Sequence, residues 1–126
     1  MKPDAKSQDA YLYDILKHAK AIQRYTTGVT SDGFWANEIL RDAVALRIAA
    51  IGEAARQINF STERALPKVP FKEIRGMRNR IAHDYGGIDF REVWKVVEQN
   101  IGPLISGLDG YVAGKKQALD NNRTAS

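Results

Sequence analysis

The side chains best suited to catalysis gather between Arg75 and Tyr85, in the stretch RGMRNRIAHDY. It holds three arginines, an asparagine, a tyrosine and one of only two histidines in the chain. A histidine exchanges protons near neutral pH, and arginine offers a permanent charge with a planar fork of donors that fits phosphate. Together they suit cleavage of a phosphodiester without a metal. The histidine would move a proton to or from an oxygen, and arginine would stabilise charge on the phosphoryl group.

A helix is predicted to carry these residues, from about Pro70 to the Gly86-Gly87 pair. Proline suits the first helical turn, and glycine supplies the left-handed stop that ends many helices. Apolar residues at three- and four-residue spacing predict one buried stripe, formed by Ile74, Met77 and Ile81.

The helical register divides the candidate residues between two faces. At roughly 100° per residue, Arg75, Asn79 and His83 fall opposite the apolar stripe, and Asn79 and His83 become neighbours. Arg78 lies about 140° from His83 by the same count. A site that contains both residues therefore needs Arg78 to reach round the helix, or a second copy of the helix to supply it.

A basic helix face with one histidine also has an ordinary explanation as a solvated surface, so a dimeric helical scaffold with a merely basic face stays open. The other histidine, His18, lies between Lys17 and Lys20 and is interpreted as an ordinary helix residue. Glu53 and Arg56, on the preceding long helix, could brace the motif, but they are interpreted as ordinary surface charge.

Composition and charge narrow the class of protein. The chain has 126 residues, 44% of them hydrophobic and 27% charged, which fits one soluble globular domain. The net charge of +4 is concentrated in the motif region, which favours an anionic partner, either nucleic acid or an acidic protein face. With no cysteines and two histidines, neither a metal nor another cofactor is expected. No membrane span or signal peptide is evident, so we expect a cytoplasmic protein.

The remaining elements are also predicted to be helical, and no strand pattern competes with them. Long helices are expected near residues 7–27, 37–58 and 88–111, with short turns near 34–35 and 62–66. The fold class is therefore an all-α, up-and-down bundle of four main helices plus short helical turns. One domain is expected over residues 1–114, followed by a disordered polar tail over 115–126.

Two of these helices carry apolar residues in unusual patterns. The apolar face of residues 39–58 is wider than one stripe, which predicts either a central helix or one shared with a partner chain. Gly52 inside that helix indicates a close approach of another helix. The last helix carries a heptad-like seam from Phe90 to Tyr111, and Pro103 is expected to kink it or remove a hydrogen bond.

The stretch from Arg78 to Tyr85 resembles the motif of HEPN-domain ribonucleases, and more closely that of the HepT subgroup. That pattern is arginine, four residues, histidine, any residue, tyrosine. Segments that begin at Asp14, Arg41, Ile51 and Val93 also resemble HepT-type segments in their usual order, so the resemblance covers most of residues 7–110. Gly86 departs from it, because a bulky residue is more usual there.

The resemblance implies a HEPN-like bundle that acts as a metal-independent endoribonuclease, the toxin of a toxin–antitoxin pair. The catalytic residues would be Arg78 and His83, with Asn79, Arg75 and Arg80 supporting them or positioning RNA. Such proteins are homodimers in which the two motif helices face each other. Arg78 of one chain would then serve the site of the other.

The resemblance also implies the partners. The substrate would be tRNA or mRNA, and the antitoxin a minimal nucleotidyltransferase (MntA-like) that inactivates the toxin by adenylylating Tyr85. The added AMP would place negative charge beside the arginines and compete with RNA phosphate. The alternative is a non-catalytic helical dimer that binds a nucleotidyltransferase and is modified by it.

Overall fold

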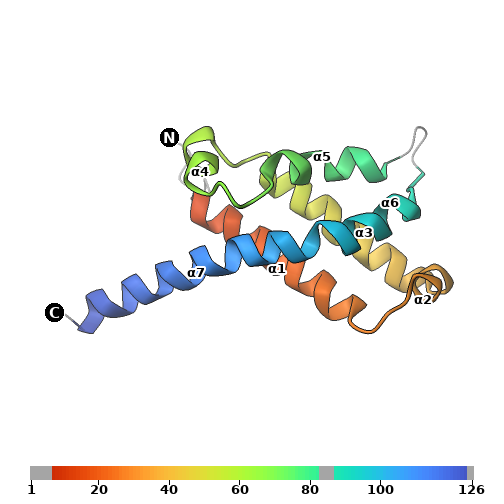
Figure 1. The fold of residues 1–126 in the computed structure, drawn as a ribbon. Helices are drawn as coiled ribbons and strands as arrows, with labels where there is room; N and C mark the ends of the chain where they lie inside the picture. The colour runs from red at the N-terminus through yellow and green to blue at the C-terminus, as the bar shows by residue number, and fades with distance from the viewer. Residues whose placement is uncertain (1–6, 83–86, 125–126) are drawn as a thin grey trace.

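The computed structural model describes residues 7–82 and 87–124, with side chains described as far as Lys115. Helices dominate this part of the chain: α1 (Gln8–Thr26), α2 (Ser31–Ala36), α3 (Glu38–Ala55), α4 (Phe60–Ala65), α5 (Phe71–Ile81), α6 (Phe90–Gln99) and α7 (Ile101–Thr124). The long helices α1, α3 and α5 and the pair α6–α7 run in alternating directions (Figure 1). The predicted all-α, up-and-down bundle of four main helices with short turns is confirmed, and its fourth member is divided in two.

Helix α1 follows its sequence pattern closely. The Ser7 hydroxyl accepts a hydrogen bond from the Ala10 backbone N–H at 3.1 Å, which caps the first turn. Gly28 follows the helix at φ +74°, the left-handed conformation predicted for it. The predicted apolar stripe is buried throughout and consists of Leu12, Ile15, Leu16, Ala19 and Ile22.

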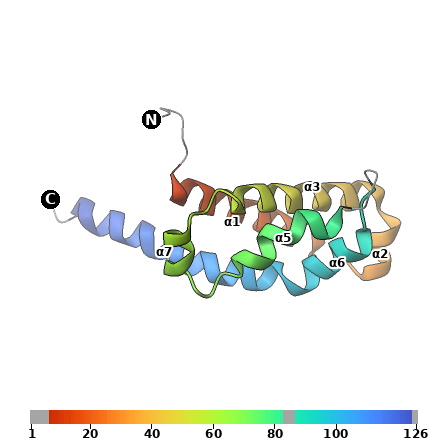
Figure 2. The ribbon, with the colours of Figure 1, turned by 90° about the horizontal axis from the view of Figure 1, so that it is seen from above.

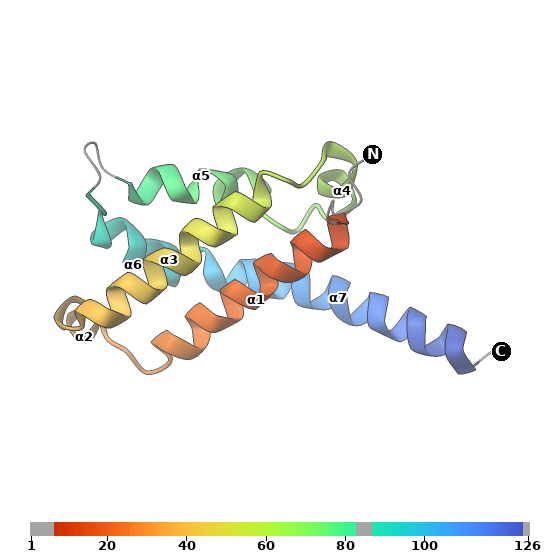
Figure 3. The same cartoon turned by 180° about the vertical axis from the view of Figure 1, so that it is seen from behind.

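Helix α3 lies between α1 and α5 and packs against both (Figure 3). One side of it is buried in the core, with Val44, Ile48 and Ile51 fully enclosed. Its other side leaves two large apolar residues in solvent, since Ile39 is 83% exposed and Leu46 is 71% exposed. The wide apolar face predicted for this helix is therefore only partly used by the described chain.

The predicted last helix is interrupted at Asn100. Its backbone N–H still bonds the Val96 carbonyl at 2.9 Å, and α7 then starts at Ile101. Pro103 falls in the first turn of α7, where its missing N–H costs no intrahelical hydrogen bond. The heptad-like seam predicted from Phe90 to Tyr111 also differs in α6. There Val93 and Val96 are fully buried, whereas Trp94 is half-buried.

Helix α7 continues to Thr124, whereas the polar composition predicted disorder from residue 115. After Gly114 the chain has no further glycine or proline, and alanine, leucine, lysine and glutamine all favour helix. The end of α7 extends beyond the other helices (Figure 2). The division into a domain and a tail stays a prediction.

Aromatic residues join the opposite end of the bundle. The rings of Phe34 and Trp94 lie 4.9 Å apart, which connects α2 to α6. The guanidinium of Arg41, on α3, lies 5.6 Å from the Trp35 ring and 4.9 Å from the Phe90 ring. These contacts hold the start of α6, and so position the chain that returns from α5.

Candidate active site

The motif helix α5 presents the predicted apolar stripe to the core. Ile74 and Met77 are completely buried, and Ile81 is 4% exposed. The helix ends at Ile81, however, and not at Gly86-Gly87 as predicted. Ala82 is extended and pairs with Ile88, and the Asp89 N–H donates to the Ile81 carbonyl at 2.7 Å. The residues on either side of the 83–86 segment are therefore held together by backbone contacts.

The early end of α5 bears on one geometric expectation. Asn79 and His83 were predicted to be neighbours on one helical face, but α5 ends at Ile81 and is capped by Ala82. His83 and Tyr85 lie outside the described residues, so their placement relative to Asn79 stays a prediction. Asn79 is exposed on the last turn of α5.

The three arginines of α5 reach three different helices. Arg75 forms an ion pair with Glu63 of α4. The Nη1 atom of Arg78 lies 3.0 Å from Oε1 of Glu53, on α3. The Nε atom of Arg80 lies 3.1 Å from Oε2 of Glu92, on α6. The arginines therefore do not form one cluster, and Arg78 is the one held on the α3 side.

Arg78 combines a defined position with access to solvent. Its side chain is 54% exposed and that of Glu53 is 52% exposed, so water screens the pair and an incoming anion can compete for the arginine. The interpretation of Glu53 as ordinary surface charge is wrong, because its carboxylate contacts the motif arginine directly.

Gly52 explains how α5 comes so close to α3 at this point. A Cβ at position 52 would lie 3.4 Å from Cβ of Arg78 and 3.5 Å from its backbone nitrogen. The close helix approach predicted from this glycine is confirmed, and it occurs at the motif arginine. Gly52 therefore allows the backbone of Arg78 to lie close to α3, and Glu53 holds the guanidinium of Arg78.

A groove of about 380 Å³ runs beside Arg78, between α3 and α5. Apart from Arg78 and Asp42 its lining is apolar, and it consists of Ala45, Leu46, Ala49, Ile81, Ala82 and Ile88. Ala82 and Ile88 are the paired residues that border the segment containing His83. A cation at the rim of an apolar groove can hold a phosphate while uncharged groups of the same molecule contact the groove.

Arg80 is more firmly engaged than Arg78. Besides Glu92, it bonds the Oδ1 atom of Asn100 at 3.2 Å through Nη1, and so joins α5 to α6 and to the break before α7. Hydrogen bonds from Arg80, and secondly from Lys95, hold the pKa of the Glu92 carboxyl below its ordinary value. Arg80 thus connects α5 to α6 through Glu92 and Asn100, and it does not share the Glu53 contact of Arg78.

Within residues 7–82 and 87–115, no group of three or more histidine, aspartate or glutamate side chains is arranged to hold a metal ion. Among the described helices, none is both long and apolar enough to cross a membrane.

The family model of the HepT-like ribonucleases matches residues 15–109, from within α1 to within α7. The chain belongs to the HepT-like ribonuclease family. This confirms the resemblance found in the sequence. All three arginines of α5, Gly52 and Glu53 lie inside the matched range.

Individual HepT-like relatives cover most of the chain. It is 39% identical to a Methanocaldococcus jannaschii protein provisionally named RNase MJ1380, over 73% of this chain and 84% of that protein. It is 31% identical to the "Probable ribonuclease HepT" of Thermococcus cleftensis, over 81% of this chain and 92% of the relative. No solved structure gives a significant match.

Proposed function

We propose that this HepT-like protein is a metal-independent endoribonuclease, the toxin of a toxin–antitoxin pair that cleaves cellular RNA. The main structural support is Arg78, a half-exposed cation held by Glu53 at the rim of the α3–α5 groove. The relatives above carry ribonuclease names, which supports the same activity.

In this mechanism His83 and Arg78 divide the chemistry. His83 takes the proton from a ribose 2′-hydroxyl, or gives one to the leaving oxygen, near neutral pH. Arg78 stabilises the negative charge that develops on the phosphoryl oxygens. Asn79, Arg75 and Arg80 support the two residues or position RNA, and of these Asn79 is the most accessible.

The active unit is a homodimer, and each site is composite. Exposed apolar residues on α3, Ile39 and Leu46, border the side on which the Arg78 groove opens, and a second copy would bury them. In such a dimer Arg78 of one chain acts with the partner's His83. Leu46 lines the groove itself, which places the apolar surface and the motif arginine on one face.

The proposed antitoxin is a minimal nucleotidyltransferase, MntA-like, that transfers AMP to Tyr85. An AMP group two residues from His83 adds bulk and negative charge where the RNA phosphate must bind. The proposed substrates are tRNA or mRNA, and the proposed compartment is the cytoplasm.

A second candidate function is a non-catalytic helical dimer that binds a nucleotidyltransferase and accepts AMP on Tyr85. The same exposed residues of α3 favour it, since they serve a dimer equally well without catalysis. It differs from the first candidate in only one measurable respect, the cleavage of RNA.

The decisive experiment incubates the purified protein with total bacterial RNA in EDTA. Intact mass first excludes AMP on Tyr85, and His83→Gln is compared with His18→Gln as the matched control. His18 is half-buried on α1 and lies 2.9 Å from Arg47 Nη1, so glutamine retains polar character there. We expect cleavage by wild type and His18→Gln, and none by His83→Gln. If unmodified wild type leaves RNA intact, the second candidate replaces the first.

A mixing experiment tests the composite site. Arg78→Gln and His83→Gln chains are each inactive alone, but a mixed dimer regains one site with both residues. Co-refolding equal amounts of the two should restore about a quarter of wild-type activity, because half of the dimers are mixed and each has one intact site. No recovery, despite mixed dimers seen by native mass spectrometry, would mean that Arg78 and His83 act within one chain.

A further inference from the structure

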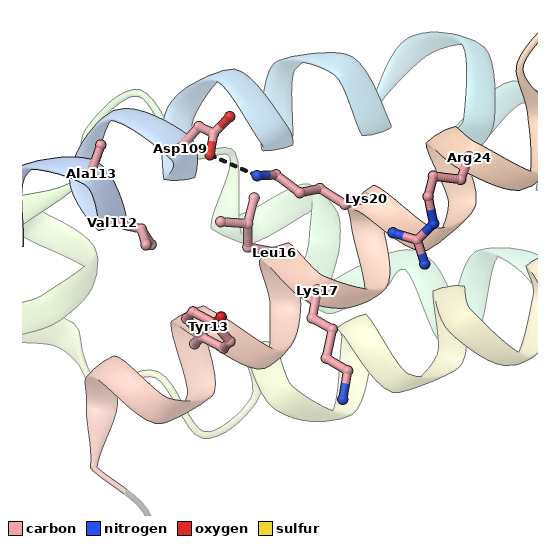
Figure 4. Close-up of a pocket in the computed structure, with 8 residues that line it drawn as sticks. All are labelled: Tyr13, Leu16, Lys17, Lys20, Arg24, Asp109, Val112 and Ala113. Atoms are coloured by element: carbon pink, nitrogen blue, oxygen red, sulfur yellow. Dashed lines mark hydrogen bonds and ion pairs between the residues drawn. The ribbon is translucent and has the colours of Figure 1, made fainter. Parts of the chain in front are cut away.

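A second basic groove lies between α1 and α7, on a different part of the bundle from Arg78. It has a volume of about 710 Å³. Three cations of α1 line it, Lys17, Lys20 and Arg24, and α7 contributes one carboxylate, Asp109. Figure 4 shows Lys20 reaching across to Asp109, while Lys17 and Arg24 extend from α1 without a partner among the residues drawn.

The cations of this groove are largely uncompensated. Lys20 Nζ lies 2.9 Å from Asp109 Oδ1, with both side chains about half exposed. Among the described residues, neither Lys17 nor Arg24 forms an ion pair or a side-chain hydrogen bond. From Lys17 to Arg24 the helix rises about 10 Å, so the positive charge follows a line and is not a single point.

The groove also offers an aromatic surface. Tyr13 lies four residues before Lys17, is 60% exposed, and lines the same groove. A row of cations beside an exposed aromatic ring is the combination with which proteins bind a nucleic-acid strand, since the cations follow the phosphates and the ring stacks on a base. An acidic protein helix would need a broad apolar floor. Besides Tyr13, the apolar lining consists only of Leu16, which is 5% exposed, and of the small side chains of Val112 and Ala113 on α7.

The α1–α7 groove lies far from Arg78, the candidate catalytic arginine. Helix α3 packs against α1 and α5, and α7 packs against α1 and α6. The α1–α7 groove and the α3–α5 groove that carries Arg78 therefore lie on opposite edges of the bundle. The straight line between them through the bundle is on the order of 20 Å, two helix diameters, which roughly six stacked nucleotides would span. An RNA strand that passes around the bundle must therefore be longer than this.

We propose that the α1–α7 groove is a second RNA-binding site, which holds the substrate backbone several nucleotides away from the cleaved bond. This inference rests on the proposed ribonuclease function and specifies its substrate class. The enzyme acts on RNA that is long or folded enough to reach around the bundle, and short oligonucleotides engage only the Arg78 side.

The experiment measures binding, so it does not depend on cleavage. The His83→Gln protein is titrated into a fluorescently labelled RNA hairpin, with and without the changes Lys17→Gln and Arg24→Gln. We expect affinity for the hairpin to fall about tenfold, and the salt dependence of binding to decrease by about 1.4 in logarithmic slope, for two lost phosphate contacts. Asp109→Asn should instead tighten binding, because it releases Lys20.

The matched control removes two positive charges elsewhere, with Arg56→Gln and Arg64→Gln, both of which are exposed. Equal weakening by the control and the groove variant would overturn the proposal, as would unchanged hairpin affinity. In cleavage assays with His83 intact, the groove variant should raise KM for the hairpin and leave cleavage of a dinucleotide unchanged. A wild type that cleaves neither RNA would refute the ribonuclease function, whereas a groove variant with normal KM would refute only this second site.

Discussion

The basic residues of α5 and those of α1 are arranged in contrasting ways. On α5, Arg75, Arg78 and Arg80 each have a carboxylate partner on a neighbouring helix. On α1, Lys17 and Arg24 have none within the described structure, and Lys20 alone is paired. Both sets are basic, so net charge alone does not distinguish them.

Paired and unpaired cations serve different purposes: a paired cation is well oriented, and an unpaired cation attracts RNA more strongly from a distance. A carboxylate partner fixes the direction of a guanidinium, which matters where donors must meet a developing charge. The same partner cancels much of the long-range field. Unpaired cations attract a polyanion from a distance but lack a fixed geometry. We therefore expect α5 to determine the rate of cleavage and α1 to determine affinity.

Substitutions of Arg78 and of Arg24 should differ most clearly in their effects on kcat and KM. Arg78→Gln removes a donor to the phosphoryl oxygens and should lower kcat by about 10²- to 10³-fold. Arg24→Gln should leave kcat unchanged and raise KM for long RNA. Steady-state cleavage of a labelled hairpin measures both constants. The contrast between α5 and α1 would disappear if both changes lowered kcat equally.

Removing the carboxylate partner of Arg78 should lower both kcat and KM. Glu53→Gln releases the guanidinium from its 3.0 Å contact, so kcat should fall about tenfold as its orientation is lost. KM should decrease, because one negative charge has been removed beside the phosphate. Glu98→Gln, on the exposed side of α6, is the control for loss of a carboxylate. A rise in both constants would contradict a positioning role.

Position 52 tests whether the backbone of α5 must stay close to α3. Gly52→Ala adds a Cβ at ordinary van der Waals distance from Arg78 and should be tolerated, since alanine favours helix by about 1 kcal/mol. Gly52→Leu should push α5 away and destabilise the protein by about 1–3 kcal/mol, with loss of cleavage. Thermal unfolding of the two variants measures this difference. Equal stability would show that the close approach is not needed.

The smallest effect concerns Glu92 and Arg80. The pKa of the Glu92 carboxyl is lowered in the folded protein, chiefly by the hydrogen bond from Arg80. Its contribution to stability is therefore complete above the ordinary glutamate pKa and is lost as the pH falls through the folded-state value. Wild type should unfold at a higher temperature than Glu92→Gln at pH 7, and this advantage should shrink in acid. An advantage that grew in acid would contradict the assignment.

Local patterns predicted the helices well where one buried stripe determines them. The spacing of Leu12, Ile15 and Ala19 in α1, and of Ile74 and Met77 in α5, agrees with their burial. Periodicity did not locate the end of α5, because Ala82 is itself a good helix former. That end depends on pairing with Ile88, which lies six positions further on and carries no helix-ending signal.

Sequence analysis could not assign the carboxylate partners of the site arginines, because they lie far away in the sequence. Glu53 and Arg78 are 25 positions apart, and only the packing of α5 on α3 brings them together. Gly52 indicated a close helix neighbour without identifying it. Glu53 was considered as a brace for the motif but was interpreted as surface charge. The α1 groove was missed because Lys17 and Lys20 are ordinary surface residues until α7 is placed beside them.

The hydrogen bond between Asp89 and Ile81 and the pairing of Ala82 with Ile88 join the two ends of the segment that holds His83 and Tyr85. Because these bonds tie the segment to the end of α5 and to the start of α6, its two ends cannot move apart unless the bonds break. The packing of Ile81 in the core therefore constrains where the segment leaves the bundle and where it returns. The stability of the scaffold and the placement of the candidate catalytic segment are thus mechanically linked at residues 81–82 and 88–89.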